Sequence, residues 1–321
     1  MAGGPRAEPL AGVRVIAFEQ AVAMPYCTFL LGELGAEVIK IERLPGGDVI
    51  RGWDDRVGGL STGYVWVNAN KRSVALDLKS DDGREVVRSL IGTADVFVEN
   101  FAPGVVDRLG IGFEEASKIR PDLVYCSLSG YGQTGPYAGM KAFDLLIQGE
   151  SGLIFTSGGP DSPAKVGIPI TDLVAGSNAV IAILAALRQR GAGGDAQFLD
   201  LSMLDSIMPW LGYYPHHIWH GGDEPERTGM RHQYITPYGP YRAGDGTLVN
   251  IAVADDRQWR VFCLDVLCDA ELAADPRFAT VIDRHRRRDA LDPLITERMA
   301  ARDAEHWLER LRAAGIPSGR V

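Results

Sequence analysis

Two aspartates, Asp144 and Asp172, are the residues of this sequence best placed to carry covalent chemistry. The sequence has no G-x-S-x-G motif, and no cysteine has an obvious histidine partner, which argues against a hydrolase-type nucleophile. Asp172 precedes a long apolar stretch, where a carboxylate is more often a helix N-cap than a catalyst. The N–H groups and dipole of a helix N-terminus would also keep that carboxylate ionised, as a nucleophile requires.

A glycine-rich segment, GYGQTG (130–135), has the G-x-G-x-x-G spacing and follows a predicted strand. A dinucleotide fingerprint also needs a helix that begins at the third glycine and an acidic residue about 20 residues later. Pro136 and Tyr137 follow the motif at once, and the first predicted βα turn, EQAVAM (19–24), contains no glycine. These features favour an active-site loop, and a nicotinamide-dependent oxidoreductase stays a distant alternative.

The segment His216-His217-x-x-His220 resembles a metal-binding run. Zinc ligands at this spacing belong on a helix face with a third ligand, whereas a proline and a glycine flank these histidines. We expect a structural role and no metal site.

Two other groups of residues are expected to be structural. The basic run RHRRR (284–288) is expected to form the solvated face of a helix. The four cysteines lack C-x-x-C spacing, so buried free thiols are expected at Cys27, Cys126, Cys263 and Cys268.

The composition is that of a globular protein: 321 residues, 46% apolar, with 33 Lys+Arg against 42 Asp+Glu and a net charge of −9. This acidic balance argues against a nucleic-acid surface, although a local basic patch could still bind a small anion. The N-terminus lacks the apolar region of a signal peptide, and no uncharged apolar stretch approaches about 18 residues. We therefore expect a cytoplasmic protein without a membrane partner.

The elements that must position Asp144 and Asp172 alternate between strands and helices. Strands are predicted at 13–18, 36–42, 73–78, 94–100, 123–130 and 196–204, and helices at 25–35, 80–92 and 103–110. A long helix over 171–190, apolar nearly all round, is expected to be buried, with Thr171 or Asp172 as its N-cap. This pattern predicts a Rossmann-like α/β domain with a parallel sheet and ligands at the carboxyl ends of its strands.

A smaller α+β domain is expected to follow. A hairpin is predicted over 236–254, and amphipathic helices near 256–268, 287–300 and 303–314. The predicted organisation is a large domain over 1–200, a linker over 201–225 and a small domain over 226–321.

Six segments, in order and at consistent spacing, resemble the family III CoA-transferases, the group that includes formyl-CoA transferase, carnitine CoA-transferase and α-methylacyl-CoA racemase. They are LGAEVIKIE (34–42), GDVIRGW (47–53), NANKRSVALDLK (68–79), DVFVENFAPGVVDRLG (95–110), SGYGQTGPYA (129–138) and GIPITDLVAG (167–176). The resemblance implies a Rossmann-like domain, a small α+β domain and a homodimer of interlocked rings. The family's chain usually continues beyond the position of Val321 and returns to the large domain, and that return is absent from this sequence.

The resemblance places the catalytic aspartate on Asp172. It also places ten residues along coenzyme A: Ala21, Val22, Ala23, Arg43, Leu76, Lys79, Asn100, Phe101, Arg108 and Lys141. The four basic residues of this set could neutralise the phosphates of an anionic cofactor. Formyl-CoA transferase has glutamine at the position of Val22. No tightly bound cofactor is implied, because CoA is part of the substrate.

The choice between transferase and racemase depends on Phe143, where racemases of the family carry histidine. Phenylalanine cannot move a proton, so a transferase is expected and a racemase stays the alternative. Asp172 would attack an acyl-CoA thioester and form first an aspartyl anhydride and then an aspartyl-CoA thioester. The acceptor is expected to be a small dicarboxylate such as succinate, malate or mesaconate, with Arg231, His232, Gln233 and Tyr234 as candidates for holding its distal carboxylate.

Overall fold

The computed structural model describes residues 8–191 and 193–321, which divide into two compact units. The large unit comprises the described residues up to Ile154 together with Lys165–His216, and the small unit comprises Phe155–Ala164 and His217–Val321. This division differs from the predicted domains in three places. Residues 201–216 belong to the large unit and residues 217–225 to the small unit, rather than to a linker. A short excursion over 155–164 also belongs to the small unit.

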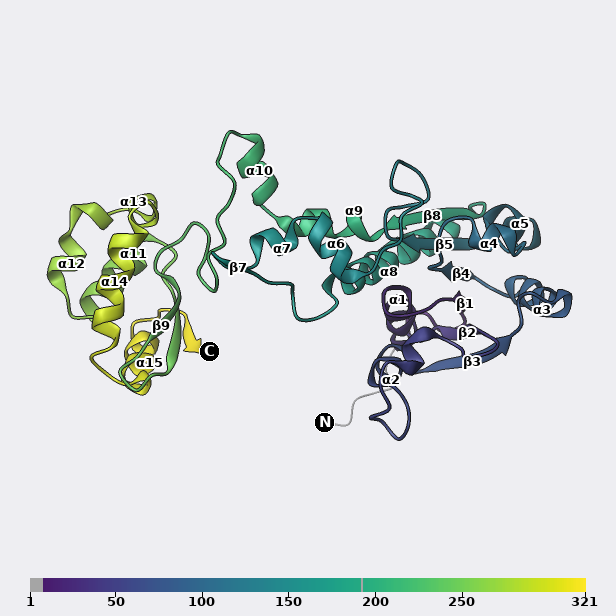
Figure 1. The fold of residues 1–321 in the computed structure, drawn as a ribbon, viewed down its shortest axis with the longest axis horizontal. Coiled ribbons are helices and arrows are strands. Elements are labelled where there is room, and N and C mark those ends of the chain that lie inside the picture. Colours follow the sequence, from purple (N-terminus) through teal and green to yellow (C-terminus); the bar gives the residue numbers. More distant parts are fainter. Residues whose placement is uncertain (1–7, 192) are drawn as a thin grey trace. The chain divides into compact units, whose positions relative to one another are not determined.

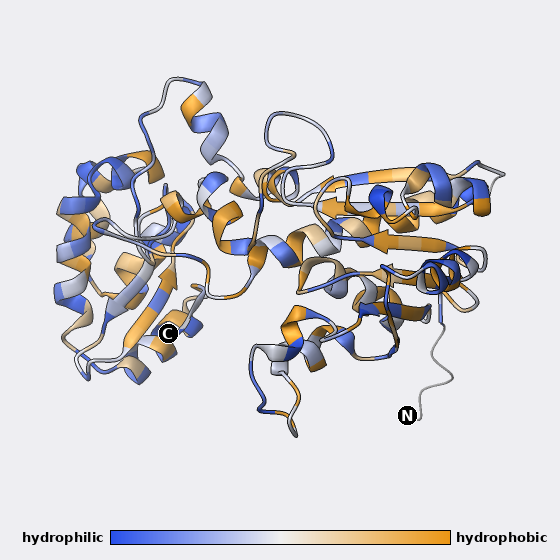
Figure 2. Ribbon diagram, turned by 45° about the vertical axis from the view of Figure 1, so that its right-hand side comes forward, coloured by the Kyte–Doolittle hydropathy of each residue, from blue (hydrophilic) through white to orange (hydrophobic). Residues whose placement is uncertain are grey.

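The large unit is built on a parallel sheet of six strands in the order β3-β2-β1-β4-β5-β8 (Figure 1). The strands are β1 (Arg14–Phe18), β2 (Glu37–Arg43), β3 (Lys71–Leu76), β4 (Val96–Glu99), β5 (Val124–Ser129) and β8 (Gln197–Ser202). The strands of this sheet are largely hydrophobic in Figure 2. Such apolar runs are typical of a parallel sheet covered on both faces, and the predicted Rossmann-like architecture is confirmed.

The strand order creates a crevice at one edge of the sheet. β2 and β3 lie on one side of β1, whereas β4, β5 and β8 lie on the other. The loops after β1 and β4 therefore leave the sheet in opposite directions, and such a switch point is where open α/β sheets bind ligands.

Helices cover both faces of the large sheet. On one face, α1 (Ala23–Glu33) and α8 (Ile170–Arg190) pack on an apolar core that includes Val15, Val98 and Leu128. On the other, the core around Ile16 and Phe97 includes residues of α3 (Asp81–Ile91), α4 (Val105–Arg108) and α5 (Phe113–Ile119).

The long helix α8 is less buried than its sequence suggested. It is long and apolar enough to cross a membrane by length and composition alone, but eight of its residues are buried within the large unit. Ile181, however, is 65% exposed, so the prediction that this helix is buried holds for only part of its surface. An apolar residue can stay at the surface when the helix face it occupies has no neighbour.

Short elements complete the large unit. They are η1 (Val49–Gly52), α2 (Thr62–Asn68), α6 (Asp144–Glu150), α7 (Leu153–Thr156, which ends in the small unit), α9 (Met203–Ile207) and η2 (Met208–Leu211). The two-stranded pair β6 (Gly158–Gly159) and β7 (Ser162–Pro163) forms the excursion into the small unit.

The small unit contains the predicted hairpin and the three predicted helices. Its antiparallel sheet has the order β11-β10-β9, with β9 (Tyr238–Arg242), β10 (Leu248–Ala252) and β11 (Ser318–Arg320). Its helices are α10 (Tyr214–Trp219, which begins in the large unit), α11 (Asp256–Val261), α12 (Ala270–Ala274), α13 (Val281–Arg286), α14 (Arg288–Met299) and α15 (Ala304–Ala313), with a π-helical turn at Phe262–Val266. Trp259, Phe262 and Trp307 are buried in its core.

Two predictions about the small unit were wrong. Arg284, expected on a solvated face, is fully buried, where its guanidinium donates to the carbonyl oxygens of Thr236 and Phe278 and pairs with Asp256 at 2.8 Å. Burial of arginine is tolerated because these acceptors satisfy its donors. Cys268, expected to be buried, is exposed, whereas the other three cysteines are buried free thiols.

Candidate active site

A cavity of about 390 Å³ lies at the switch point of the large sheet. The turn after β1, the loops after β4 and β5 and the first turn of α8 all contribute to its wall. It contains Asp172 and six of the ten residues predicted to lie along CoA, namely Ala21, Val22, Ala23, Asn100, Phe101 and Lys141. Residues over 100 positions apart in the sequence therefore meet in one cavity.

The other four predicted CoA residues do not line this cavity. Arg43 and Leu76 are register partners at the carboxyl ends of β2 and β3, and the Arg43 side chain donates to the Gly47 carbonyl oxygen at 3.1 Å. Lys79 follows β3 and is exposed, and Arg108 lies in α4. Their contact with CoA stays a prediction.

Several residues of the cavity were not predicted from the sequence, among them Gln20, Trp53, Ser129 and Met203. Gln20 lies two residues after β1 and Ser129 ends β5, and both strands were predicted, so their position at the carboxyl edge of the sheet was an available signal. Nothing in the local sequence of Trp53 or Met203 distinguishes them from core or surface residues.

Asp172 is the third residue of α8, and it does not cap that helix. Pro169 occupies the N-cap position and makes no side-chain cap bond. Asp144, from α6, takes over this role: its Oδ1 accepts from the Thr171 backbone N at 2.9 Å and from Thr171 Oγ1 at 2.8 Å. The predicted capping by Thr171 or Asp172 was therefore wrong, and the Asp172 carboxylate is left free of a capping role.

The position of Asp144 is itself held by a buried amide. Gln148 is fully buried, and its Nε2 donates to Asp144 Oδ2 at 2.7 Å. Its Oε1 accepts from the backbone N of Val166 at 2.8 Å. Gln148 thus connects α6 to the segment that leads into α8.

The Asp172 carboxylate is easily protonated in this environment. Burial raises its pKa to about 7, with a smaller contribution from the negative charge of Asp144. Among the described residues, no donor forms a hydrogen bond with Asp172 to offset these effects. The helix N-terminus was expected to keep this carboxylate ionised. Burial outweighs that effect, so the protonated acid and the carboxylate coexist near pH 7.

The turn after β1 is held by side chains from distant segments. Ala21 has φ +60°, a left-handed conformation unusual for a residue with a Cβ, and its N–H donates to Asp48 Oδ1 at 3.0 Å. The Asn100 side chain accepts from the Gln20 N–H at 2.8 Å and donates to the Gln20 carbonyl oxygen at 2.9 Å. Asn100 therefore shapes the cavity by holding this turn.

A buried ion-pair cluster lies behind the turn. Lys40 Nζ is 2.7 Å from Asp48 Oδ2 and 3.5 Å from Glu19 Oε1, and all three side chains are fully buried or nearly so. Lys71 Nζ also lies 2.7 Å from Glu19 Oε1, and burial lowers the pKa of Lys71 to about 8. The charges of this cluster are paired with one another and fix Asp48 under Ala21.

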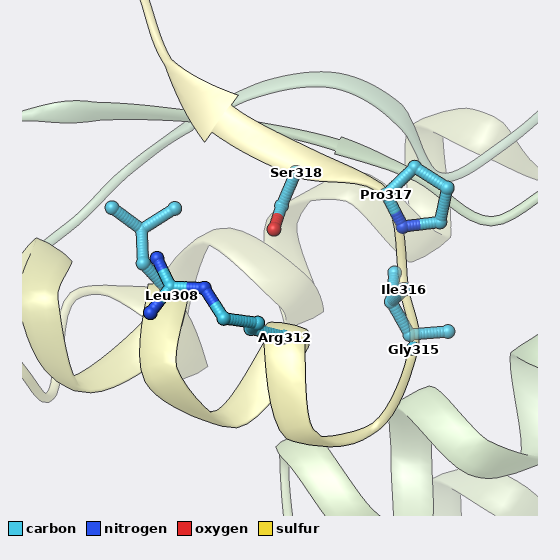
Figure 3. Close-up of a pocket in the computed structure, with 6 residues that line it drawn as sticks. All are labelled: Leu308, Arg312, Gly315, Ile316, Pro317 and Ser318. Atoms are coloured by element: carbon cyan, nitrogen blue, oxygen red, sulfur yellow. The ribbon is translucent and has the colours of Figure 1, made fainter.

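Two other cavities lack this combination of groups. One, of about 320 Å³, has the carboxylates Glu99, Asp107 and Glu114 in its wall, which suits an anionic cofactor poorly. The other, of about 340 Å³, lies in the small unit and has Arg312 as its charged group (Figure 3). Within 8–191 and 193–321, no group of three or more His, Cys, Asp or Glu is arranged to hold a metal ion.

Comparison with known proteins decides the family. The model of CoA-transferase family III matches residues 10–321, nearly the whole chain. The chain belongs to this family. The mouse protein named succinyl-CoA:glutarate CoA-transferase is 37% identical over 316 residues, which are 98% of this chain and 72% of that protein. Acetyl-CoA:oxalate CoA-transferase of Acetobacter aceti is 38% identical over 97% of this chain and 80% of its own length.

A solved structure gives the same result for the fold. The crystal structure of a CAIB/BAIF family protein from Brucella suis matches with a TM-score of 0.84 and 36% identity. The match covers 97% of this chain and 83% of that protein. As a member of CoA-transferase family III, the chain is an enzyme whose substrates are CoA thioesters.

The first prediction concerns the acidity of Asp172 in this CoA-transferase. If its carboxylate is the reacting form, kcat/KM for the acyl-CoA should rise with pH through an apparent pKa near 7. Removing the negative charge of Asp144 in Asp144→Asn favours ionisation of Asp172, so the rising limb should move to lower pH. Glu150→Gln, at the exposed end of α6, should leave the profile in place. A limb that does not move in Asp144→Asn would mean that another group titrates.

Proposed function

We propose that this enzyme transfers CoA from an acyl-CoA thioester to a small dicarboxylate, with Asp172 as the nucleophile. One observation carries this proposal: the partly buried Asp172 carboxylate, which has no hydrogen-bond donor among the described residues, lines the same cavity as Lys141 at the switch point of the sheet. The names of the relatives support the substrate class, since they pair acetyl- or succinyl-CoA with glutarate, oxalate or mesaconate.

The reaction needs only carboxylate and thiolate chemistry. The ionised Asp172 attacks the thioester carbon, and the C–S bond breaks to leave an aspartyl anhydride and CoA thiolate. The thiolate attacks the aspartyl carbonyl and releases the first acid, which leaves an aspartyl-CoA thioester. The acceptor carboxylate then reverses the sequence and departs as the new acyl-CoA. Each step exchanges bonds of similar energy, so the protein must hold the reactants in register and keep water away.

Charge favours an anionic substrate in the cavity despite the net charge of −9. Lys141 contributes a cation to the wall itself. We place the phosphates of CoA along the carboxyl edge of the sheet, where Arg43 ends β2 and Lys79 follows β3. Arg108, in α4, is the fourth cation of this proposed path.

The racemase alternative has no support in the cavity. Phe143 is 67% exposed and belongs to the wall next to Asp144, at the position where racemases of the family have histidine. Its ring offers no proton donor or acceptor, so a two-base exchange at the α-carbon lacks its second base.

The residues that recognise the distal carboxylate of the acceptor stay a prediction. Arg231 is one of the four candidates, and in the small unit its guanidinium pairs with Asp292 at 2.5 Å. Asp292 also accepts from Tyr241. A substrate carboxylate would therefore have to compete with Asp292 for Arg231.

We also propose that the active form is a homodimer. Four large apolar side chains of adjacent elements in the large unit are more than half exposed: Leu145, Leu146, Ile181 and Trp210. Apolar exposure of this kind is typical of surfaces that are buried in an assembly. A cytoplasmic location completes the proposal.

The second prediction tests the covalent intermediate. Incubation with an acyl-CoA donor and no acceptor should activate the Asp172 carbonyl, and hydroxylamine should convert it to a hydroxamate that peptide mass spectrometry localises. Succinyl-CoA, acetyl-CoA and a longer acyl-CoA should be compared as donors. With a dicarboxylate acceptor present, the same donor should yield the new acyl-CoA.

Asp144 is the internal control, because it lies in the same region and its carboxylate is occupied by Thr171 and Gln148. A hydroxamate at Asp144 instead of Asp172 would contradict the assignment of the nucleophile. Exchange with no adduct at any residue would point to direct transfer in a ternary complex.

A further inference from the structure

One polar side chain of the cavity has no assigned role. Ser129 is the last residue of β5 and is 7% exposed, and its hydroxyl oxygen is buried with no hydrogen-bond partner among the described residues. Ser129 lines the same cavity as Asp172. An unsatisfied buried hydroxyl destabilises the fold, so its persistence at this position calls for a ligand that satisfies it.

The neighbouring polar groups already have partners within the protein. Asn100 is engaged with Gln20, and the Ala21 N–H donates to Asp48. The hydroxyls nearest to Ser129 along the sheet are also occupied. Ser127, two residues earlier on β5, bonds to Glu99 and accepts from Gln133, and Ser202, the register partner of Ser129 on β8, caps α9.

We propose that the Ser129 hydroxyl donates a hydrogen bond to the carbonyl oxygen of the acyl group while Asp172 attacks it. This inference rests on the proposed CoA-transfer function. As an Asp172 oxygen bonds to the thioester carbon, the π electron pair of the C=O bond moves onto the carbonyl oxygen. Ser129 Oγ–H donates a hydrogen bond to this negatively charged oxygen. The pair then returns to re-form C=O and the C–S bond breaks, so that the thiolate leaves with its electrons. Ser129 keeps its proton throughout.

The chemistry of a hydroxyl fits this place better than a permanent charge would. A neutral donor fixed at the end of a strand strengthens its bond as the oxygen gains charge, which lowers the barrier more than it tightens substrate binding. Removing one such donor typically costs about 10²–10³ in kcat. Because the hydroxyl has no hydrogen-bond partner in the part of the chain that the structure describes, its removal should not weaken the fold.

The test compares Ser129→Ala with Ser127→Ala in single-turnover experiments. Hydroxylamine trapping at Asp172 measures the rate of acylation with succinyl-CoA in excess. For Ser129→Ala we expect this rate to fall about 100-fold, with the KM for the donor changed less than threefold and a thermal midpoint equal to or above that of the wild type. For Ser127→Ala we expect the opposite pattern, an unchanged acylation rate and a lower midpoint, because Glu99 loses a buried partner.

The outcomes separate this inference from the function on which it rests. If the wild type forms the Asp172 adduct and Ser129→Ala forms it at the same rate, Ser129 has no part in the chemistry and the inference is wrong. If Ser129→Ala loses stability together with activity, the hydroxyl is structural and the inference is also overturned. If the wild type forms no adduct, the proposed function itself fails and the role of Ser129 fails with it.

Discussion

Replacing Asp172 with asparagine is expected to lower the exchange of acyl-CoA by at least about 1,000-fold, because an amide cannot form the anhydride. Binding of CoA should change little, since the side chain keeps its size. The measurement is the turnover of labelled CoA between donor and free acid, together with CoA binding by calorimetry. Retention of exchange in Asp172→Asn would contradict the nucleophile assignment.

The same substitution should make the protein more stable above neutral pH. Because the pKa of Asp172 is about 7 in the folded protein against 3.8 for an ordinary aspartate, the folded state binds the proton more tightly. Wild-type stability from this group is therefore greatest below pH 4 and is lost as the pH rises to about 7. At about 1.4 kcal/mol for each pKa unit, the loss reaches roughly 4 kcal/mol at most.

Unfolding in urea at pH 5 and pH 8 measures this effect. The stability advantage of Asp172→Asn over the wild type should grow between the two pH values, whereas Asp161→Asn, at an exposed aspartate, should show no such growth. A constant difference would mean that the carboxylate is not destabilised by burial. An active site that is less stable than its inert variant is typical of enzymes that bury a reactive charge.

The second large effect is expected at Lys40. In Lys40→Met, Asp48 and Glu19 lose the buried cation between them, and breaking a buried pair in this way costs about 3–5 kcal/mol. Urea unfolding should show this loss. CoA binding should weaken as well, because Asp48 then holds the N–H of Ala21 less firmly.

The matched control is Lys118→Met. Lys118 pairs with Glu115 on the surface of α5, where the two side chains are 68% and 51% exposed. Exposed pairs contribute about 0–1 kcal/mol, so this variant should unfold almost like the wild type. Equal losses in the two variants would show that the buried cluster is not what holds the turn after β1.

The sequence was sufficient to predict the elements whose pattern is local. The apolar runs around Val15, Val98 and Cys126 predicted buried parallel strands because both faces of each strand face a core. The alternation with amphipathic helices then predicted the Rossmann-like order. The turn after β1 and the first turn of α8, which the family resemblance assigned to the site, line one cavity of the structure, and their roles stay predictions.

What escaped prediction depends on contacts between distant segments. Asp144 caps a helix that begins 26 residues later. Local spacing in the sequence therefore cannot predict that its carboxylate accepts from the Thr171 N–H. The basic neighbours of Arg284 predict a surface residue. Arg284 is nevertheless buried, because carbonyl oxygens of Thr236 and Phe278 accept hydrogen bonds from its guanidinium. Ser129 carries no signal beyond its place at a strand end, because an unsatisfied hydroxyl is visible only when every neighbour has been placed.

The buried amide of Gln148 gives the chain an anchor for mechanical load. The backbone returns from the small unit to the large unit at Lys165, and the next residue, Val166, is tied to Gln148 and through it to Asp144. A force along this connection therefore acts first on the hydrogen bonds of Gln148 and Asp144, which hold the start of α8, and only then on the sheet. Asp144 also raises the pKa of Asp172, although burial contributes more, so one buried amide positions both the cap of α8 and a negative charge beside the proposed nucleophile.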